Sequence, residues 1–328
     1  MILERHFIKK LAYFFLLLIV QLSFLEFLAR LMYTSRTDLY FKHSSIVNQL
    51  SQIHVLILGA SHGEKSLNPQ FFREKTFNLS YSSQDVYYDY QIIEKYIDRL
   101  PSLQTVILTL SWFSFGYDEE TYEPFFAKDY YHELGISPRS QNILRTWLYS
   151  SLFYTHHYGL IKDLILKKRP VLHRIDTCSA VSENSNLPDE VLIANGYRYN
   201  NTYMPSSQLL RHGQLKAENH QSLYNRDLIN ENMTYYQKII TLLLARKKNI
   251  VLITPPYSKA YRSSFNSSYL NEFYTLITQL KKQFPQIEYY DFSNWKLTDD
   301  CFWDSDHLNI TGAEKFSKHL DSLLFNSR

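Results

Sequence analysis

Three side chains near opposite ends of one stretch of chain have the residue types that nucleophilic catalysis by serine requires. Ser61 follows the apolar run His54–Leu58, so we expect it just past the carboxyl end of a buried strand, where open parallel sheets place their functional groups. Asp304 and His307 lie three residues apart before the last helical segment. A serine hydroxyl becomes a good nucleophile when an imidazole, oriented by a carboxylate, takes its proton. We predict Ser61 as nucleophile, His307 as base and Asp304 as orienting acid.

Each of these residues also has a structural alternative. Serine is a favoured helix N-cap, so Ser61 could cap a helix that follows the strand. Asp304 and His307 could satisfy each other and hold a loop together. Asp306 is a rival carboxylate, less favoured because its adjacency to His307 tends to send the two side chains apart.

The stretch LGASHGEKS around Ser61 also comes close to a phosphate-binding loop. That loop needs a second glycine at position 64, where this chain has Glu64, whose β-carbon obstructs the bend and whose carboxylate repels phosphate. His62 has no second and third metal ligand at suitable sequence spacing. We therefore predict no nucleotide, no metal and no cofactor.

Short apolar runs alternate with amphipathic segments of helix length, which is the pattern of an α/β fold with a parallel sheet. The predicted strands are His54–Leu58, Thr105–Leu110, Asn249–Thr254 and Ile287–Asp291. The predicted helices are Asp85–Arg99, Arg226–Lys247, Asn271–Phe284 and Thr311–Phe325, the last with a capping box at Thr311 and Glu314.

The segment 115–225 does not keep this alternation. It is rich in Tyr, Ser, Asn and Arg, and it contains one helical piece near Gln141–Lys167. We interpret it as an insertion. In an α/β fold such an insertion commonly emerges from the carboxyl end of a strand and shapes the substrate cleft, and a second structural lobe is an equal alternative.

The N-terminus predicts a membrane anchor. Basic residues precede the apolar segment Leu11–Ala29, which is long enough to span a bilayer and is not followed by a small-residue cleavage site before Arg30. We predict an uncleaved anchor over residues 1–33, a polar tether over 34–51 and a globular domain over 52–328. An amphipathic helix lying on a surface is the alternative.

Composition excludes several classes of protein. The formal net charge is +3 on 328 residues, and no Lys/Arg cluster stands out. Nucleic-acid binding usually requires a strongly basic surface, so we predict no nucleic-acid partner. Cys178 and Cys301 cannot build a zinc site or a disulfide framework, and the sequence leaves open whether they pair. The 27 Tyr and 21 Phe beside 8 Gly suit both core packing and stacking on sugar rings.

The segment Gly59–His62 and the pair Asp304 and His307 together resemble the SGNH hydrolases, also called GDSL-like hydrolases. The resemblance implies a three-layer α/β/α sandwich with a parallel sheet and assigns the triad as above. It also implies an oxyanion hole from backbone donors of Ser61 and Ser80. The family's third block carries an asparagine, whereas the corresponding strand end here, Leu110–Ser114, has none.

Membrane-anchored members of this superfamily add or remove acyl groups on envelope polysaccharides, and this chain is similar to them. The resemblance implies acyl transfer, most simply of acetyl, through an acyl-Ser61 intermediate to a polysaccharide hydroxyl, with a membrane partner as acyl donor and an extracytoplasmic domain. Tyr257 and Trp112 are the candidate sugar-binding side chains. An esterase with the same triad and a catalytically silent glycan- or partner-binding domain are the alternatives.

Overall fold

The computed structural model describes residues 2–32, 37–122, 124–140, 151, 190–192 and 194–325. Its centre is a parallel sheet in the order β2-β1-β3-β6-β7. The strands are β1 (Val55–Leu58), β2 (Thr76–Asn78), β3 (Thr105–Thr109), β6 (Asn249–Thr254) and β7 (Glu288–Asp291). A separate antiparallel hairpin joins β4 (Glu190–Leu192) and β5 (Arg198–Asn200).

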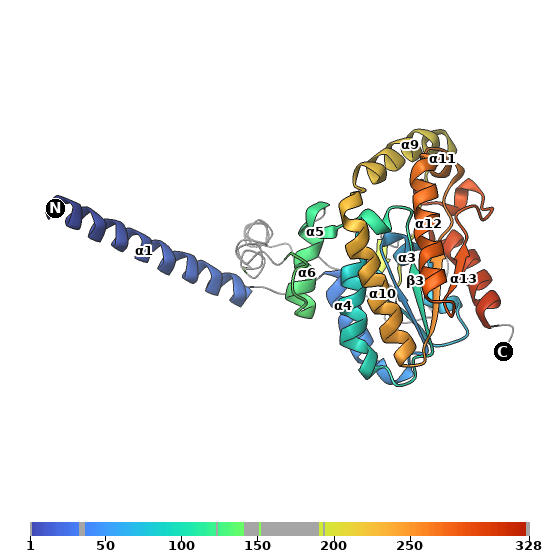
Figure 1. Cartoon of the computed structure of the whole chain (residues 1–328), viewed down its shortest axis with the longest axis horizontal. Helices are drawn as coiled ribbons and strands as arrows, with labels where there is room; N and C mark the ends of the chain where they lie inside the picture. The colour runs from blue at the N-terminus through green and yellow to red at the C-terminus, as the bar shows by residue number, and fades with distance from the viewer. Residues whose placement is uncertain are drawn as a thin grey trace.

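Alternate residues of each central strand enter two different cores. Leu56 and Leu58 of β1 pack into a core with residues of the helices on one face, while Val55 and Ile57 pack into a second core on the other. The first core contains side chains of α4 (Val86–Tyr96), α10 (Ile229–Ala245) and α12 (Ser267–Gln283), and the second contains side chains of α13 (Ile310–Phe325) and β5. Helices therefore cover both faces (Figure 1), and the predicted three-layer α/β/α sandwich is confirmed.

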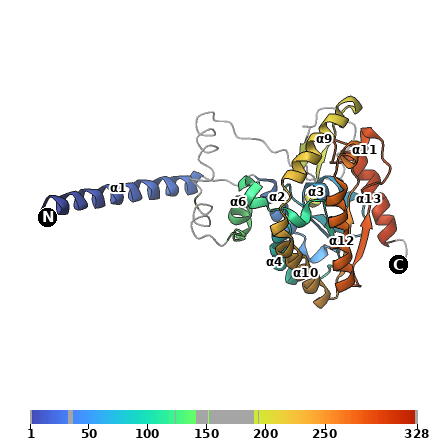
Figure 2. The same cartoon turned by 45° about the horizontal axis from the view of Figure 1, so that its top comes forward.

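The N-terminal helix α1 (Ile2–Met32) extends away from the sandwich (Figure 2). Its segment His6–Ala29 has a mean hydropathy of 2.2, and its large apolar side chains are exposed. By length and composition it is able to cross a membrane, as an anchor or a signal sequence would.

The predicted tether contains a structural element of the domain, contrary to our expectation. Residues Asp38–Val47 form helix α2, whose Leu39, Lys42 and Ile46 side chains are fully buried. Thr37 caps this helix by accepting a hydrogen bond from Tyr40 N–H. The polar sequence did not indicate this helix because two of its four buried residues, Asp38 and Lys42, are charged, and charged side chains are seldom buried unless they are paired.

The insertion contains α5 (Glu119–Tyr122), α6 (Pro124–Leu134), the β4–β5 hairpin and α9 (Ser206–Ser222). The end of the insertion is bonded to the loop before α13, because Met204 N–H donates to Phe302 O at 3.2 Å and Asn309 Nδ2 donates to Thr202 O at 3.3 Å. The predicted helical piece Gln141–Lys167 and Cys178 lie outside the described residues, Ser151 excepted. Cys301 is buried as a free thiol.

One helix start differs from the predicted capping box. Asn309 Oδ1 accepts a hydrogen bond from Gly312 N–H at 3.0 Å, so asparagine caps α13 two residues before the predicted position at Thr311. Glu314 pairs with Lys318 along the helix surface instead.

Candidate active site

The structure brings Ser61, His307 and Asp304 into one continuous hydrogen-bonded chain. The Ser61 hydroxyl lies 2.8 Å from His307 Nε2, and His307 Nδ1 lies 3.0 Å from each carboxylate oxygen of Asp304. This arrangement fits the tautomer in which Nδ1–H donates to the carboxylate and Nε2 accepts the hydroxyl proton. His307 is 7% exposed, and Ser61 is partly buried.

Ser61 is placed by a tight turn between β1 and the short helix α3 (Ser61–Ser66). Ala60, not Ser61, occupies the N-cap position, and Ser61 is the first helical residue, so the capping alternative is wrong. The hydroxyl is therefore available to His307. Because the first N–H groups of a helix have no partner inside the helix, the Ser61 N–H suits the predicted oxyanion donor.

Two glycines of this turn are required by close packing against Thr109 at the end of β3. Gly59 has φ of 128°, and a β-carbon there would lie 2.0 Å from Thr109 Oγ1. A β-carbon on Gly63 would lie 2.3 Å from the same oxygen. The resemblance of this stretch to a phosphate-binding loop therefore has a packing explanation.

Asp304 holds its own loop in addition to His307. Its Oδ1 atom accepts hydrogen bonds from the backbone N–H groups of Asp306 at 3.0 Å and His307 at 2.8 Å. The loop is closed by a hydrogen bond from Trp303 N–H to His307 O at 3.0 Å. One carboxylate thus fixes both the backbone and the imidazole of residue 307, and the structural and chemical interpretations of this pair are compatible.

The second predicted oxyanion donor is engaged elsewhere. Ser80 N–H donates to Asn78 Oδ1 at 2.9 Å, while Asn78 Nδ2 donates to the carbonyl oxygens of Gly63 and Leu67. Asn78 thereby ties the end of β2 to helix α3. In this arrangement the Ser80 N–H is not available to a substrate oxygen, so its predicted role would require it to leave Asn78.

A second hydrogen-bonded chain, which the sequence did not indicate, lies against the first. His62 Nε2 lies 3.1 Å from Asp306 Oδ2, and His62 Nδ1 lies 2.5 Å from the Ser111 hydroxyl. His62 and Asp306 are each 1% exposed. The only sequence signals were the neighbours of the two predicted catalytic segments, because position 62 follows Ser61 and position 306 precedes His307.

The pKa values of His307 and His62 are shifted in opposite directions by their surroundings. Burial opposes the charged form of His307, but the Asp304 and Asp306 carboxylates outweigh it and raise the pKa of its imidazole. Burial is the largest effect on His62 and lowers its pKa despite the hydrogen bond to Asp306. His307 is therefore the better proton acceptor of the two.

The predicted sugar-binding pair is buried, which corrects that assignment. Tyr257 is 1% and Trp112 is 3% exposed, and their rings pack edge to face with centroids 4.9 Å apart. Tyr257 also packs against the His62 ring at 4.9 Å. These aromatic side chains support the site from beneath and present no ring face to a ligand in solution.

Helix α9 of the insertion packs beside the site. His212 Nδ1 lies 2.9 Å from the hydroxyl of Ser305, which is in the loop that carries Asp304 and His307. A β-carbon on Gly213 would lie 2.7 Å from the backbone of helix α11 (Lys259–Ser263), so the two helices are in close contact. This part of the insertion therefore contacts the loop that carries Asp304 and His307.

One group of side chains has the composition of a metal site. Ligand atoms of His62, Asp306 and His307 lie within 4.8 Å of one another, although their sequence spacing gave no such indication. Each is already hydrogen-bonded inside the two chains described above. These internal bonds account for the cluster, and we assign no metal to it.

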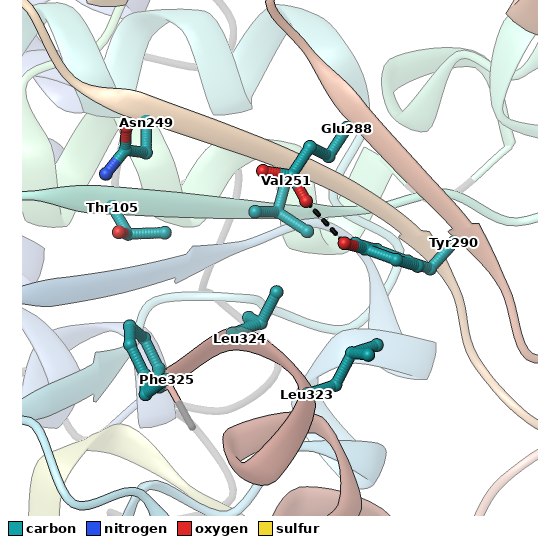
Figure 3. Close-up of a pocket in the computed structure, with 8 residues that line it drawn as sticks. All are labelled: Thr105, Asn249, Val251, Glu288, Tyr290, Leu323, Leu324 and Phe325. Carbon is teal, nitrogen blue, oxygen red and sulfur yellow. Dashed lines mark hydrogen bonds between the residues drawn. The ribbon is translucent and has the colours of Figure 1, made fainter. Parts of the chain in front are cut away.

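A pocket of about 280 Å³ lies at the other end of the sheet (Figure 3). It is lined by Thr105 and Asn249, the first residues of β3 and β6, and by residues at the end of α13. Glu288 and Tyr290, which are hydrogen-bonded to each other, complete the wall. Ser61 follows the opposite end of β1, so this pocket has no part in the chemistry described here.

Several carboxyl groups outside the triad are buried, and two of them, Asp85 and Asp89, line a small cavity together with Ala60. Burial is the main cause that raises the pKa of Asp85 to about 6, of Asp129 to about 7 and of Asp89 to about 8. Glu119 is also shifted upward, and neither of its carboxylate oxygens has a hydrogen-bond partner among the described residues. Of these groups, Asp89 retains its proton in the folded protein at neutral pH, whereas Asp85 is mainly ionised there beside Arg139.

The Asp89→Asn variant is expected to remove one source of pH dependence. The folded-state pKa of Asp89, about 8, exceeds the ordinary value of 3.8, so its proton is lost from the unfolded chain first and its ionisation costs stability as pH rises toward 8. Between pH 6.5 and 8.5 the free energy of unfolding of the wild type should fall relative to the variant by up to about 2 kcal/mol. Urea unfolding of both proteins in the same detergent measures this difference, and parallel pH profiles would contradict it.

Comparison with known proteins gives weak likeness to solved structures. One is described as a "putative platelet activating factor" from Streptococcus pneumonia, with 11% identity, a TM-score of 0.42 and coverage of 88% of this chain and 91% of that chain. Another is a "putative acylhydrolase" from Bacteroides fragilis, with 11% identity, a TM-score of 0.40 and coverage of 89% and 99%. No protein-family model and no curated protein matches the chain.

Proposed function

We propose that this protein is a membrane-anchored serine acyltransferase that moves an acetyl or similar group to a hydroxyl of a cell-envelope polysaccharide. The observation that carries the proposal is the hydrogen-bonded chain from Ser61 through His307 to Asp304. It has the order of nucleophile, base and orienting acid used by serine-dependent acyl transfer. The apolar helix α1 supports attachment to a membrane.

The proposed reaction has two acyl transfers. His307 Nε2 takes the Ser61 proton as Oγ attacks the carbonyl carbon of the donor, and the imidazolium then gives that proton to the departing donor group. The acyl-Ser61 ester is next attacked by an acceptor hydroxyl whose proton passes to His307, which returns it to Ser61. The Ser61 N–H is the proposed donor to the oxyanion in both steps.

Water instead of a sugar as acceptor would make the same site an esterase. The same three side chains favour this second candidate equally, because they act before the acceptor is chosen. Transfer requires a site that aligns the sugar hydroxyl and excludes water. The partial exposure of Ser61 is compatible with either acceptor.

Fluorophosphonate labelling of the detergent-solubilised full chain tests the proposal. We expect Ser61 to be labelled in the wild type, labelling to vanish in Ser61→Ala, and labelling to persist in the control Ser263→Ala, whose side chain is exposed on α11. No labelling of the folded wild type would support a catalytically silent binding domain instead. A chromogenic acetyl ester, with and without oligosaccharide, then separates acetylated sugar from free acetate.

A further inference from the structure

The chain Ser111–His62–Asp306 repeats the residue types of the proposed triad in a place that substrate cannot reach. Ser111 and His62 are each 1% exposed, and the Ser111 N–H donates to the Ser114 hydroxyl at 2.8 Å. The Tyr257 hydroxyl lies 3.4 Å from His62 Nδ1 and covers it further. A buried serine of this kind cannot act as a second nucleophile, so the arrangement calls for another explanation.

The two chains meet at His307. Asp306 Oδ2 lies 3.8 Å from His307 Nδ1, and the His62 and His307 rings have centroids 5.0 Å apart. Asp304 contacts the same nitrogen at 3.0 Å. Two carboxylates therefore face one imidazole, although a triad needs only one.

Hydrogen bonds fix the Asp306 carboxylate in its position beside His307. His62 Nε2–H donates to Oδ2, and the Ser305 hydroxyl donates to Oδ1 at 3.3 Å. A neutral imidazole carries one N–H. If His62 uses Nε2–H to donate to Asp306, its Nδ1 is the acceptor, and the Ser111 hydroxyl lies 2.5 Å away as the donor to that nitrogen. Ser111 thus sets the tautomer of His62, and His62 orients Asp306.

The other groups around His307 give the direction of the electrostatic effect. On the same loop lie the acids Asp304 and Asp306, on α3 lies His62, and on α9 lie His220 and Lys216. Burial lowers the pKa of His220 to about 3, so it is neutral near pH 7. Lys216 acts against protonation of His307, and the two carboxylates outweigh it.

We propose that Asp306 is a positioning residue that supplies a second negative charge to the His307 imidazolium, and that His62 and Ser111 hold its carboxylate in place. This inference rests on the proposed function, in which that imidazolium forms each time Ser61 reacts. Ser111 occupies the strand end where the resembling family has an asparagine, so this chain uses that position to support the base.

Titration of His307 by NMR tests the electrostatic effect without relying on turnover. The signal is assigned as the one missing in His307→Gln, in full-length protein in detergent with EDTA present. A unit charge about 4 Å away contributes strongly even at intermediate dielectric, so we expect Asp306→Asn to lower the pKa of His307 by at least about one unit. His62→Gln, which keeps an N–H donor toward Asp306, should shift it by less than about 0.3 units.

The pH dependence of fluorophosphonate labelling adds the catalytic readout. The acidic limb of the labelling rate should move to lower pH in Asp306→Asn by the same amount as the NMR midpoint, because Ser61 reacts when His307 is neutral. If Asp306→Asn does not fold, the double variant Asp306→Asn with His62→Gln replaces it in both measurements, because its two amide side chains can form a hydrogen bond with each other. If Asp306→Asn folds and the pKa of His307 measured by NMR does not change, the inference about Asp306 is wrong while the proposed function stands. If folded wild-type protein is not labelled, the proposed function itself is wrong.

Discussion

His307→Gln is expected to lower kcat/KM for a chromogenic acetyl ester by about 10⁴- to 10⁶-fold, because glutamine cannot take the Ser61 proton. The hydrogen bond of 2.8 Å between Ser61 Oγ and His307 Nε2 places this nitrogen where it can accept that proton. Steady-state kinetics on folded, full-length protein measures the loss. The matched control is His319→Gln. His319 lies in α13, where its ring stacks on that of Trp295, and its replacement should leave kcat/KM within about twofold of the wild type.

Asp304→Asn separates the charge of this residue from its structural role. Asparagine keeps an oxygen that can accept the backbone N–H groups of Asp306 and His307, so the loop should persist. It removes the carboxylate that selects the His307 tautomer, and losses of about 10⁴-fold are typical of that change in serine-dependent enzymes. If both His307→Gln and Asp304→Asn folded and kept more than about a tenth of the activity, base catalysis by this chain would be refuted.

The strands β1, β3 and β6 were predictable because they are buried on both faces along almost their whole length. Such strands have continuous apolar sequences, and the runs at 54–58, 105–110 and 249–254 contain the strands that form. The edge strand β7 is only partly buried, and its prediction at 287–291 depended on its place after an amphipathic helical segment. The three-residue strand β2 escaped notice because Thr76–Asn78 offers one large apolar side chain. Its place at the edge of the sheet depends on pairing with β1, which is a tertiary contact that no local pattern records.

The meeting of Ser61 with His307 was predictable from topology, since both follow strands of one parallel sheet at its carboxyl edge. The roles of Asp306 and His62 were not. The expectation that the Asp306 and His307 side chains would point apart holds only in part, because Asp306 is hydrogen-bonded to His62 while its Oδ2 remains 3.8 Å from His307 Nδ1. The hydrogen-bond partner of this carboxylate is a residue 244 positions away, which no local pattern indicates.

For the aromatic residues, residue type alone did not predict the correct role. A tyrosine after a core strand fits a ligand platform and a buried support equally well by residue type. Tyr257 is buried because Trp112, Tyr261 and His62 surround it, and two of these neighbours, Trp112 and His62, come from distant parts of the chain. Burial of this kind is set by packing between elements, which composition does not specify.

Helix α2 supplies the other large expected effect, through a buried ion pair. Lys42 Nζ lies 2.8 Å from Glu64 Oε1 and also donates to the Ser80 carbonyl, and both charged side chains are fully buried. The Ser82 hydroxyl donates to the other Glu64 oxygen at 2.7 Å. The pair thus joins helix α2, which follows the apolar helix α1, to the helix that begins with Ser61.

Lys42→Met is expected to lower the free energy of unfolding by about 3–5 kcal/mol, because it leaves the Glu64 carboxylate buried without its cation. Urea unfolding in detergent at pH 7 measures this loss. Lys42→Met combined with Glu64→Gln removes both charges and should recover part of the stability. A matched exposed pair, Lys318 and Glu314, provides the control, since Lys318→Met should cost less than about 1 kcal/mol.

The pH dependence of the same variant tests the cause of the loss. Burial opposes ionisation of Glu64, but Lys42 and Lys65 outweigh it and lower its pKa to about 2, so its stabilising contribution is present above pH 4.5 and is lost as pH falls toward 2. Without Lys42, burial should instead raise that pKa, so protonation would relieve the variant's defect. The deficit of Lys42→Met relative to wild type should therefore shrink between pH 7 and pH 4.5, whereas a deficit that is constant with pH would show that lost packing, not the stranded charge, destabilises the variant.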